Sequence, residues 1–388
     1  MAGGGAAQKE TALPAQLLAW YDVAGRDLPW RAIGEGGSPD PYRVWLSEIM
    51  LQQTTVATVI PYYQAFLGRW PDVHSLATSD LDGVLHGWQG LGYYARARNL
   101  HRCARMVSQE HGGVFPDNEA GLLELPGIGP YTAAAIAAIA FNRLSVVVDG
   151  NVERVMARFY GEEAPLPQAK SLLHAYAAAL TAQVTDRPGD YAQALMDLGA
   201  TVCTPRNPDC GACPWSGNCR ALADDRTAEL PRRSRRKKRR LRYGAVFWLL
   251  RPDGSVLLQR RPEKGLLGGM MEFPGTDWRD EAWSRDQALA VAPLGNDWRV
   301  LSEPIRHIFT HFELEMTVFV ACAEKNPGKA IAQAGSSRIW VLPGKLGEHA
   351  LPTLMRKVAD LALAAEEAGP PTEPDISKGD YPLDASPI

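Results

Sequence analysis

Leu125-Pro126-Gly127-Ile128-Gly129-Pro130-Tyr131-Thr132 is followed directly by the Ala-rich segment 133–141. Two glycines in front of a helix allow backbone N–H groups to converge at its N-terminus without obstruction by side chains, a geometry that suits a phosphate group. A lone G-x-G usually marks only a turn. Here Val148-Asp149-Gly150-Asn151-Val152 and then a cysteine cluster follow along the chain, so the combination is specific. We therefore expect Gly127 and Gly129 to lie at a phosphate-binding turn.

The cysteine cluster predicts a metal site. Four of the six cysteines, Cys203, Cys210, Cys213 and Cys219, have the spacing C-x6-C-x2-C-x5-C. In a reducing compartment such a group binds metal rather than forming disulfides, because thiolates are soft ligands for zinc and for iron–sulfur centres. The favoured ligand is a 4Fe-4S cluster. Zinc remains an alternative, although zinc sites often contain two C-x2-C pairs and this chain has one.

The length of 388 residues predicts two or three domains. From Leu13 to Leu222 the apolar residues recur at helical spacing, for example in Trp45–Gln64 and Leu172–Val184. Strand signals begin only later, so a domain of mixed α and β type is expected from Tyr243. Its expected strands are Gly244–Leu250, Ser255–Gln259, Arg306–His311, Leu314–Ala321 and Arg338–Leu342, with a turn at Pro252-Asp253-Gly254 and a helix over Leu351–Ala365.

Charge is unevenly distributed, although the formal net charge is only -3. Nearly every residue from Arg232 to Arg242 is Arg or Lys, which indicates either a nucleic-acid contact or a solvated, extended connector. Beyond Ala365 the tail is rich in Pro and acidic residues, which predicts disorder. The chain has no apolar run of transmembrane length, and its first residues do not resemble an export signal. We expect a cytoplasmic protein.

The sequence resembles the helix-hairpin-helix DNA glycosylases, and among them the adenine DNA glycosylases of MutY type. The resemblance covers Leu13 to Leu222 and implies an all-α domain of two lobes, with DNA across the cleft and the four cysteines on a 4Fe-4S cluster. We expect this domain at 1–225, a basic linker at 226–242, an α+β Nudix-like domain at 243–365 and a disordered tail at 366–388. The motifs are Leu28-Pro29-Trp30-Arg31, Trp45–Thr54, Gly90-Leu91-Gly92-Tyr93-Tyr94, the glycine turn, Val148–Arg154 and the cysteines.

Two carboxylates meet the needs of glycosidic bond cleavage, which requires a proton on the departing base and negative charge near a cationic sugar. The resemblance points to Glu48 as the acid that protonates adenine N7 and to Asp149 as the anion beside the sugar. We hypothesise that a dry environment raises the pKa of Glu48, whereas Asp149 stays ionised near the N–H groups of the glycine turn. The structural alternatives are a solvated helix residue for Glu48 and a helix N-cap for Asp149.

Tyr131 distinguishes the branches of the superfamily. Relatives of endonuclease III have a Lys at this position, and its amine forms a Schiff base that leads to strand cleavage. A tyrosine cannot form that imine, so we expect base hydrolysis that leaves an abasic site. By the same resemblance, Asn151 helps to hold Asp149 and the attacking water. The structural alternative is that Tyr131 only packs at the start of its helix.

An adenine inside the stack is out of reach, so the base must be flipped out. The resemblance makes Gln53 and Tyr93 the residues that enter the duplex beside the orphaned base, while Leu51 and Arg31 line the base pocket or its approach. The structural alternatives are a helix-face amide, a core aromatic residue, a core Leu and a surface Arg.

The carboxy-terminal domain is similar to the Nudix hydrolases over fewer residues. Gly268–Gly275 matches the start of the Nudix pattern, but Asp277–Ala290 lacks the Arg and Glu residues that would hold magnesium on one helix. We therefore expect recognition of the oxidised guanine rather than hydrolysis. Phe309-Thr310-His311 matches a Phe-Ser-His segment that approaches the lesion in the family, with Thr in place of Ser.

Together these features predict a monofunctional glycosylase that removes adenine opposite 8-oxoguanine or guanine, acting as a monomer on double-stranded DNA. One alternative is a bifunctional glycosylase and lyase of endonuclease III type. Others are a non-catalytic damage sensor and a nucleotide hydrolase with an added DNA-binding domain. The presence of Glu48 and Asp149 opposes the sensor, and the incomplete Nudix pattern opposes the hydrolase.

Overall fold

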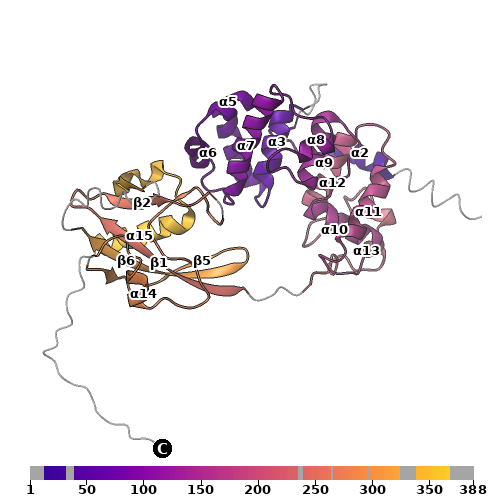
Figure 1. Ribbon diagram of the computed structural model, residues 1–388. Coiled ribbons are helices and arrows are strands. Elements are labelled where there is room, and N and C mark those ends of the chain that lie inside the picture. Colours follow the sequence, from indigo (N-terminus) through magenta and orange to yellow (C-terminus); the bar gives the residue numbers. More distant parts are fainter. Residues whose placement is uncertain are drawn as a thin grey trace, which may run out of the picture. The chain divides into compact units, whose positions relative to one another are not determined.

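The computed structural model describes residues 13–31, 39–234, 239–263, 265–295, 297–323 and 338–367 (Figure 1). The chain divides into two units, Met1–Lys237 and Lys238–Ile388, and each is considered by itself. The first is helical and the second is built on a sheet, so the predicted order of an all-α domain and an α+β domain is confirmed. Within the described ranges, no helix is long and apolar enough to cross a membrane.

The first unit consists of two groups of helices. One group packs around α7, which contacts α3, α5 and α6, and the other packs around α10 and α12, which contact α2, α11 and α13 (Figure 1). The elements are α2 (Leu13–Ala24), α3 (Pro41–Leu51), α4 (Val56–Arg69), α5 (Val73–Thr78), α6 (Leu81–Gly87), α7 (Ala95–Glu110), α8 (Glu119–Leu123), α9 (Pro130–Phe141), α10 (Gly150–Tyr160), α11 (Lys170–Thr181), α12 (Pro188–Asp197), a π-helical turn η1 (Leu198–Val202), η2 (Ser216–Asn218) and α13 (Arg220–Ala223).

Helix α9 joins the two groups, since it contacts α3 and α8 on one side and α12 on the other. Every residue from Thr132 to Ala140 is buried, as expected for a helix that is apolar around its whole circumference. Its alanines allow close approach: a Cβ on Gly189 of α12 would lie 2.6 Å from the Ala138 carbonyl oxygen. The segment after the glycine turn is therefore the central helix of the unit, and its N-terminus lies between the two groups.

The segment Trp45–Gln64, whose apolar residues recur at helical spacing, lies in two helices. Helix α3 ends at Leu51, and α4 begins after Thr55, whose side chain accepts a hydrogen bond from the Thr58 amide as an N-cap. Gln53, between them, has φ of 61° in the left-handed region. The predicted helical character is present, and the two helices are separate because a left-handed residue ends a right-handed helix. The break moves Gln52 and Gln53 out of the helix and onto a loop.

The second unit has a seven-stranded mixed sheet in the order β3-β2-β1-β6-β4, with β5 paired to β6 and β7 paired to β2. Its centre is the parallel pair β1–β6, in register from Arg240↔Phe312 to Leu250↔Cys322. Helix α15 packs on one face of the sheet and α14 lies on the other. The elements are β1 (Arg240–Leu250), β2 (Val256–Arg260), β3 (Met271–Glu272), α14 (Arg285–Leu289), β4 (Arg299–Val300), β5 (Ile305–Ile308), β6 (Phe312–Cys322), β7 (Arg338–Val341), η4 (Pro343–Glu348) and α15 (Thr353–Glu367).

The segment 277–290, where a Nudix hydrolase would have its metal-binding helix, contains one short helix. Within 277–290, α14 spans five residues, Arg285–Leu289, and Asp286 is its single acidic residue in the first turn. Carboxylates on so short a helix cannot form the extended row that magnesium and a pyrophosphate require. Glu272 is instead paired with Arg261.

Both ends of the basic run belong to folded structure. Arg232 and Ser234 pair with Leu166 of the first unit through backbone hydrogen bonds of 2.8 and 3.0 Å, whereas Arg240–Arg242 already form the start of β1. The run at 235–238 lies outside the described residues. At the other end of the chain α15 extends to Glu367, because Glu366 accepts a hydrogen bond from the Trp248 indole. The remainder of the predicted tail, 368–388, lies outside the described residues.

Candidate active site

Glu48 projects from α3 into a cleft of the first unit. Helix α3 starts at Pro41, capped by the Asp40 carboxylate, and its face from Val44 to Met50 is buried. Glu48 is only 5% exposed. Burial is the main cause that raises its pKa to about 7; the Tyr131 hydroxyl and Arg31 oppose this rise, and the nearby Asp149 adds to it. The expected dry environment of Glu48 is present, so it is not a solvated helix residue.

Asp149 lies across the cleft at the start of α10. Its Oδ1 accepts hydrogen bonds from the amides of Asn151 and Val152 at 2.9 and 2.7 Å, and its Oδ2 accepts one from the Asn151 side chain at 2.8 Å. Asp149 is therefore the N-cap of α10 and also faces the cleft. The two interpretations are compatible, because each carboxylate oxygen has lone pairs to spare.

The pKa of Asp149 does not follow the hypothesis in full. Burial raises it above the usual value, and the hydrogen bonds from Val152 and Asn151 only partly oppose that rise. The Asp149 carboxylate is more buried than that of an N-cap residue at an exposed helix end. Three N–H donors favour the charged form of Asp149. For Glu48, the hydrogen bond that favours the charged form comes from the phenol of Tyr131.

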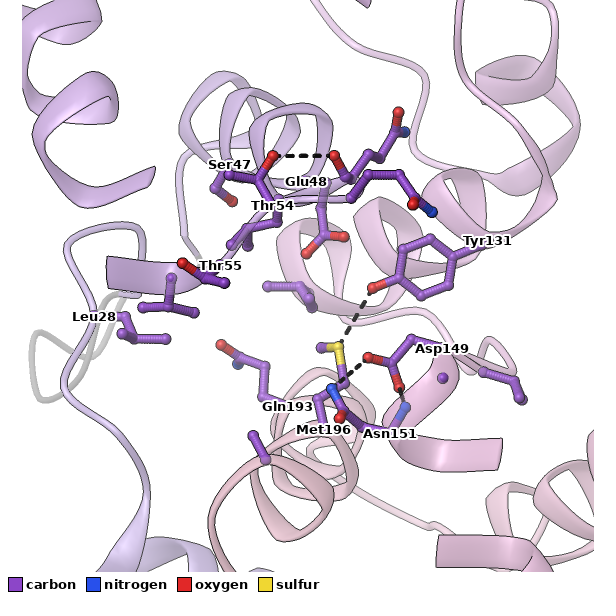
Figure 2. A pocket seen from close by; sticks show the side chains of 18 of the residues that line it. Leu28, Ser47, Glu48, Thr54, Thr55, Tyr131, Asp149, Asn151, Gln193 and Met196 are labelled. Atoms are coloured by element: carbon purple, nitrogen blue, oxygen red, sulfur yellow. Dashed lines mark hydrogen bonds between the residues drawn. The ribbon is translucent and has the colours of Figure 1, made fainter. Parts of the chain in front are cut away.

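Tyr131 completes the group in the first turn of α9. Its hydroxyl donates to Sδ of Met196 at 3.5 Å and lies close enough to Glu48 to affect its pKa. Figure 2 shows the side chains of Glu48, Tyr131 and Asp149 pointing into the same space from three separate elements. The space belongs to a cleft of about 840 Å³, within the range of about 300–1,000 Å³ typical of small-molecule sites.

Arg31 and Leu51 also line this cleft. The Arg31 side chain is 4% exposed and is held by both oxygens of the fully buried Asp197, at 2.7 and 2.8 Å. Arg26 donates to the same carboxylate through its amide and its Nε. Arg31 is therefore fixed within the wall of the cleft and is not a mobile surface residue.

Gln193 and Met196 are cleft residues that sequence reasoning missed. They lie three residues apart on α12, and the Gln193 side chain is 5% exposed (Figure 2). Their only sequence signal is a polar amide within the otherwise apolar face of Tyr191–Leu195. Asp197, one turn further along the same helix, is likewise a polar residue that follows apolar ones.

The glycine turn has the predicted conformation. Gly127 has φ of 83°, and a Cβ there would lie 2.6 Å from Cβ of Asn99 on α7. Gly129 is the N-cap residue of α9 and has no side chain to cover the first amides of that helix. These amides have no partner inside the helix, so they are available to an anion.

Gln53 and Tyr93 lie on two loops, both exposed and both in the left-handed region, with φ of 61° and 48°. The Tyr93 ring is 50% exposed, so it is not a core aromatic residue. Gln53 also lines the edge of the cleft. The structure thus brings Gln53, with Leu51, to the mouth of the cavity that contains the two acids.

The four cysteines line one cavity, together with Arg158. They are neither paired as disulfides nor fully exposed, and Arg158 donates to Sγ of Cys203 at 3.3 Å. Over the part of the chain that the structure describes, no three His, Cys, Asp or Glu side chains are placed to hold a single metal ion. Four soft thiol donors around a shared space suit a cluster, whose irons lie apart, better than one zinc ion with sulfurs at about 2.3 Å.

Arg154 connects the cysteine loop with the acid side of the cleft. Its guanidinium donates to the carbonyl oxygen of Cys203 at 2.7 Å, to that of Gly199 at 2.5 Å and to Oδ1 of Asn151 at 3.0 Å. Asn151 in turn donates to Asp149. The loop that contains the first cysteine therefore supports the carboxylate through two side chains.

In the second unit, Phe309-Thr310-His311 forms the turn between β5 and β6. Phe309 stacks on Trp278 with ring centroids 5.4 Å apart, and its amide donates to the Phe312 carbonyl oxygen at 2.9 Å. Thr310 and His311 are exposed at the tip. The trio is thus a packed aromatic anchor followed by two exposed polar residues.

Three family models match the chain. Residues 46–176 match the HhH-GPD superfamily base excision DNA repair protein, residues 203–219 the iron-sulfur binding domain of endonuclease III, and residues 245–361 the NUDIX domain. The adenine DNA glycosylase of Homo sapiens is 36% identical over an alignment that covers 90% of this chain and 73% of that protein. This chain belongs to the adenine DNA glycosylase family.

Other members of the adenine DNA glycosylase family match as well. The protein of Mycolicibacterium smegmatis is 44% identical over 53% of this chain and 68% of its own length. That of Arabidopsis thaliana is 40% identical over 71% of this chain and 49% of its own length. The chain is thus an N-glycosylase of base excision repair, and the resemblance stated from its motifs is confirmed. The match over 203–219 confirms the iron–sulfur cofactor in place of zinc.

Proposed function

We propose that this adenine DNA glycosylase is monofunctional and hydrolyses the N-glycosidic bond of adenine mispaired with 8-oxoguanine or guanine. The observation that supports it is the convergence of Glu48 and Asp149 on one cleft, each with a raised pKa and with different hydrogen-bond partners. Because Glu48 titrates at about 7, it is protonated in a large fraction of molecules near neutral pH. Asp149, with three N–H donors, is the group suited to hold negative charge.

Each acid then has one role in the reaction. Glu48 donates its proton to N7 of the extruded adenine, which accepts the electron pair of the breaking C1′–N9 bond. The sugar acquires oxocarbenium character, and the Asp149 carboxylate stabilises that positive charge. A water adds to C1′ and its proton passes to the Glu48 carboxylate, which restores the acid, so the products are free adenine and an abasic site. Asn151 keeps Asp149 in position through its amide group.

The cleft wall supplies groups that can recognise the base. Gln193 offers a buried amide with both a donor and an acceptor, which matches the edge of adenine that contains N6 and N7. Its carbonyl oxygen is suited to accept from the N6 amine while Glu48 addresses N7. Gln53 and Tyr93, on the two exposed loops, fill the space that the base leaves, because flipping leaves an unstacked gap in the duplex.

Tyr131 supports hydrolysis over the lyase alternative. Its phenol has no amine with which to form an imine, and burial raises its pKa well above the usual value, so it stays protonated. It is therefore a hydrogen-bond donor beside Glu48. Cys203, Cys210, Cys213 and Cys219 would hold the iron–sulfur cluster, which would fix the loop whose Cys203 carbonyl oxygen accepts a hydrogen bond from Arg154.

The second unit and the basic run recognise the rest of the substrate. The exposed Thr310 and His311 approach the oxidised guanine, anchored by the stacking of Phe309 on Trp278. Among the described arginines of the run, Arg232 is paired with Glu163 and Arg242 with Asp280, whereas Arg233 lines the cleft. Arg233 is thus placed to contact a phosphate and contribute salt-dependent affinity.

The decisive experiment measures single-turnover adenine release by Glu48→Gln and Asp149→Asn. Both changes preserve shape, and Asn remains a good N-cap, so α10 should stay folded. We expect each variant to lose adenine release by about a hundredfold or more. The matched control is Asp80→Asn, another N-cap carboxylate, which accepts from the Gly83 amide at the start of α6. Near-normal release by either active-site variant would refute the assignment.

The same assay separates the alternatives. Duplexes with adenine opposite 8-oxoguanine, adenine opposite guanine, and thymine glycol are compared, with borohydride added to trap any imine. Release of adenine without a trapped adduct supports the proposal, while thymine glycol release with an abundant adduct indicates the lyase.

We also propose a cytoplasmic monomer, since reduced thiol ligands persist in a reducing compartment. A dimer in light scattering would contradict the monomer.

A further inference from the structure

Arg96, at the start of α7, joins two loops that are separate in sequence. Its NH1 donates to the carbonyl oxygens of Ile49 and Met50 at 2.7 and 3.1 Å, at the C-terminus of α3. Its NH2 donates to those of Leu91 and Gly92 at 2.9 and 3.3 Å. The first pair of carbonyls precedes the Gln53 loop, and the second pair precedes Tyr93. One guanidinium therefore ties both loops to α7.

The surroundings of Arg96 strengthen this connection. Its guanidinium lies over the ring of Trp88 at 5.1 Å and over that of Tyr93 at 5.8 Å. Trp88 Nε1 also donates to the Gly92 carbonyl oxygen at 3.0 Å. The positive charge lies where the last carbonyls of α3 have no partner within the helix, which is favourable for a cation.

Both loops also have the same backbone feature. Gln53 and Tyr93 are non-glycine residues with φ of 61° and 48°, a region that such residues adopt only where their surroundings enforce it. The hydrogen bonds from Arg96 to both loops hold the backbone in this region. A lysine could not replace it, because one ammonium cannot present the planar set of N–H donors that reaches carbonyls on two sides.

We propose that Arg96 is a positioning residue that locks the Gln53 and Tyr93 loops into a single wedge for base extrusion. The inference rests on the proposed entry of these two residues into the duplex. Arg96 itself does not touch the reacting atoms and is not among the residues that line the cleft. Its removal should therefore slow the opening of the duplex more than the chemical step.

The test compares two duplexes that differ in the cost of extrusion. In one, adenine lies opposite guanine; in the other, the same adenine lies opposite an abasic-site analogue, so no partner base has to be separated. We expect Arg96→Ala to slow single-turnover release from the first duplex by about tenfold or more, and from the second by less than about threefold. Arg96→Lys should give the same pattern with a smaller loss on the first duplex. The matched control, Arg102→Ala, removes an exposed arginine of the same helix and should leave both rates unchanged.

Equal losses on both duplexes would overturn the proposal, because a general loss of stability affects both substrates alike. Full activity of Arg96→Lys on the first duplex would also overturn it. If Arg96→Ala does not fold, as judged by its melting curve and its iron content, Arg96→Lys decides the question alone. Failure of the wild-type protein to release adenine from either duplex would instead refute the proposed function.

Discussion

Both carboxylate oxygens of Asp197 bind the guanidinium of Arg31, at 2.7 and 2.8 Å, and link residues 166 positions apart in sequence. Neither side chain has appreciable contact with solvent, since Asp197 is 0% and Arg31 4% exposed. Arg26 shares the carboxylate. Asp197 therefore neutralises the positive charge of Arg31. This cleft-lining arginine is thus not an unpaired buried cation.

Asp197→Asn should destabilise the first unit strongly. The change leaves Arg31 and Arg26 without their anion, and removal of one partner of a buried pair costs about 3–5 kcal/mol. Urea unfolding of the full chain checks this. Asp224→Asn is the matched control, because its pair with Arg220 is exposed and should contribute less than about 1 kcal/mol. Similar losses in the two variants would contradict the assignment.

The residues that local chemistry determines could be predicted from the sequence. Asp149 precedes a helix as an N-cap must, and Gly127 needs the left-handed conformation that its turn provides. The β1 segment Ala245–Leu249 is a continuous apolar run because both faces of its sheet are covered. In each case the physical requirement acts within a few residues of sequence, which makes the pattern visible without coordinates.

Features that depend on distant contacts could not be predicted. Nothing nearby in the sequence shows that Gln193 faces a cleft, or that Asp197 is buried against Arg31, rather than lying on a solvated surface. The parallel pairing of β1 with β6 joins segments that begin at Arg240 and Phe312, and no local pattern selects that neighbour. The break at Gln53 contains no Gly or Pro that would mark it, and the Arg96 side chain that contacts the preceding carbonyls lies 46 and 47 positions away in sequence.

The rate of adenine release should have a bell-shaped dependence on pH. Glu48 must be protonated to act as the acid, and its pKa is raised to about 7, so the rate should fall about tenfold per pH unit above that value. Asp149 must be ionised, so the rate should also fall in acid, at a pH above the usual range for Asp because burial raises its pKa. Single-turnover rates between pH 4 and 9 test both limbs. A flat profile from pH 6 to 9 would exclude Glu48 as the acid.

Glu48→Gln should change the pH dependence of stability as well as activity. The pKa of Glu48 is about 7 in the folded protein and near 4.5 in the unfolded chain. The stabilisation by its protonated form is thus complete below 4.5 and is lost as the pH rises through 7. The substituted glutamine cannot ionise, so relative to the wild type the variant should gain roughly 3 kcal/mol between pH 4.5 and 8. Urea unfolding at pH 5 and pH 8 measures most of this difference, and parallel behaviour of both proteins would contradict it.

Substitutions of Arg154 and of Arg158 should differ in their effects, because Arg154 supports both the active site and the cysteine loop, whereas Arg158 supports only the loop. Both donate to the loop at Cys203, but only Arg154 also donates to Asn151. Arg158→Met and Arg154→Met should each accelerate loss of the absorbance near 400 nm when a chelator is added, since the cysteine loop loses its donors. Only Arg154→Met should slow single-turnover adenine release in protein that still holds its full iron content, by about tenfold. Equal rates in the two variants would show that Arg154 acts on the loop alone.

Gly127→Ala and Gly129→Ala should differ although the two glycines lie in one turn. Gly127 has φ of 83° and its added Cβ would lie 2.6 Å from Cβ of Asn99, so the alanine variant should lose about 1–3 kcal/mol of stability. Gly129 has φ of -99°, and a Cβ there would meet nothing within 4 Å, so its folding should be almost unaffected. Its methyl group would instead lie beside the open amides of α9 and weaken DNA binding by obstructing the approach of a phosphate. Melting curves and salt titrations of DNA affinity distinguish the two effects. Loss of stability in Gly129→Ala would contradict the open space around this residue, whereas normal DNA affinity in this variant would show that the turn does not bind phosphate through its amides.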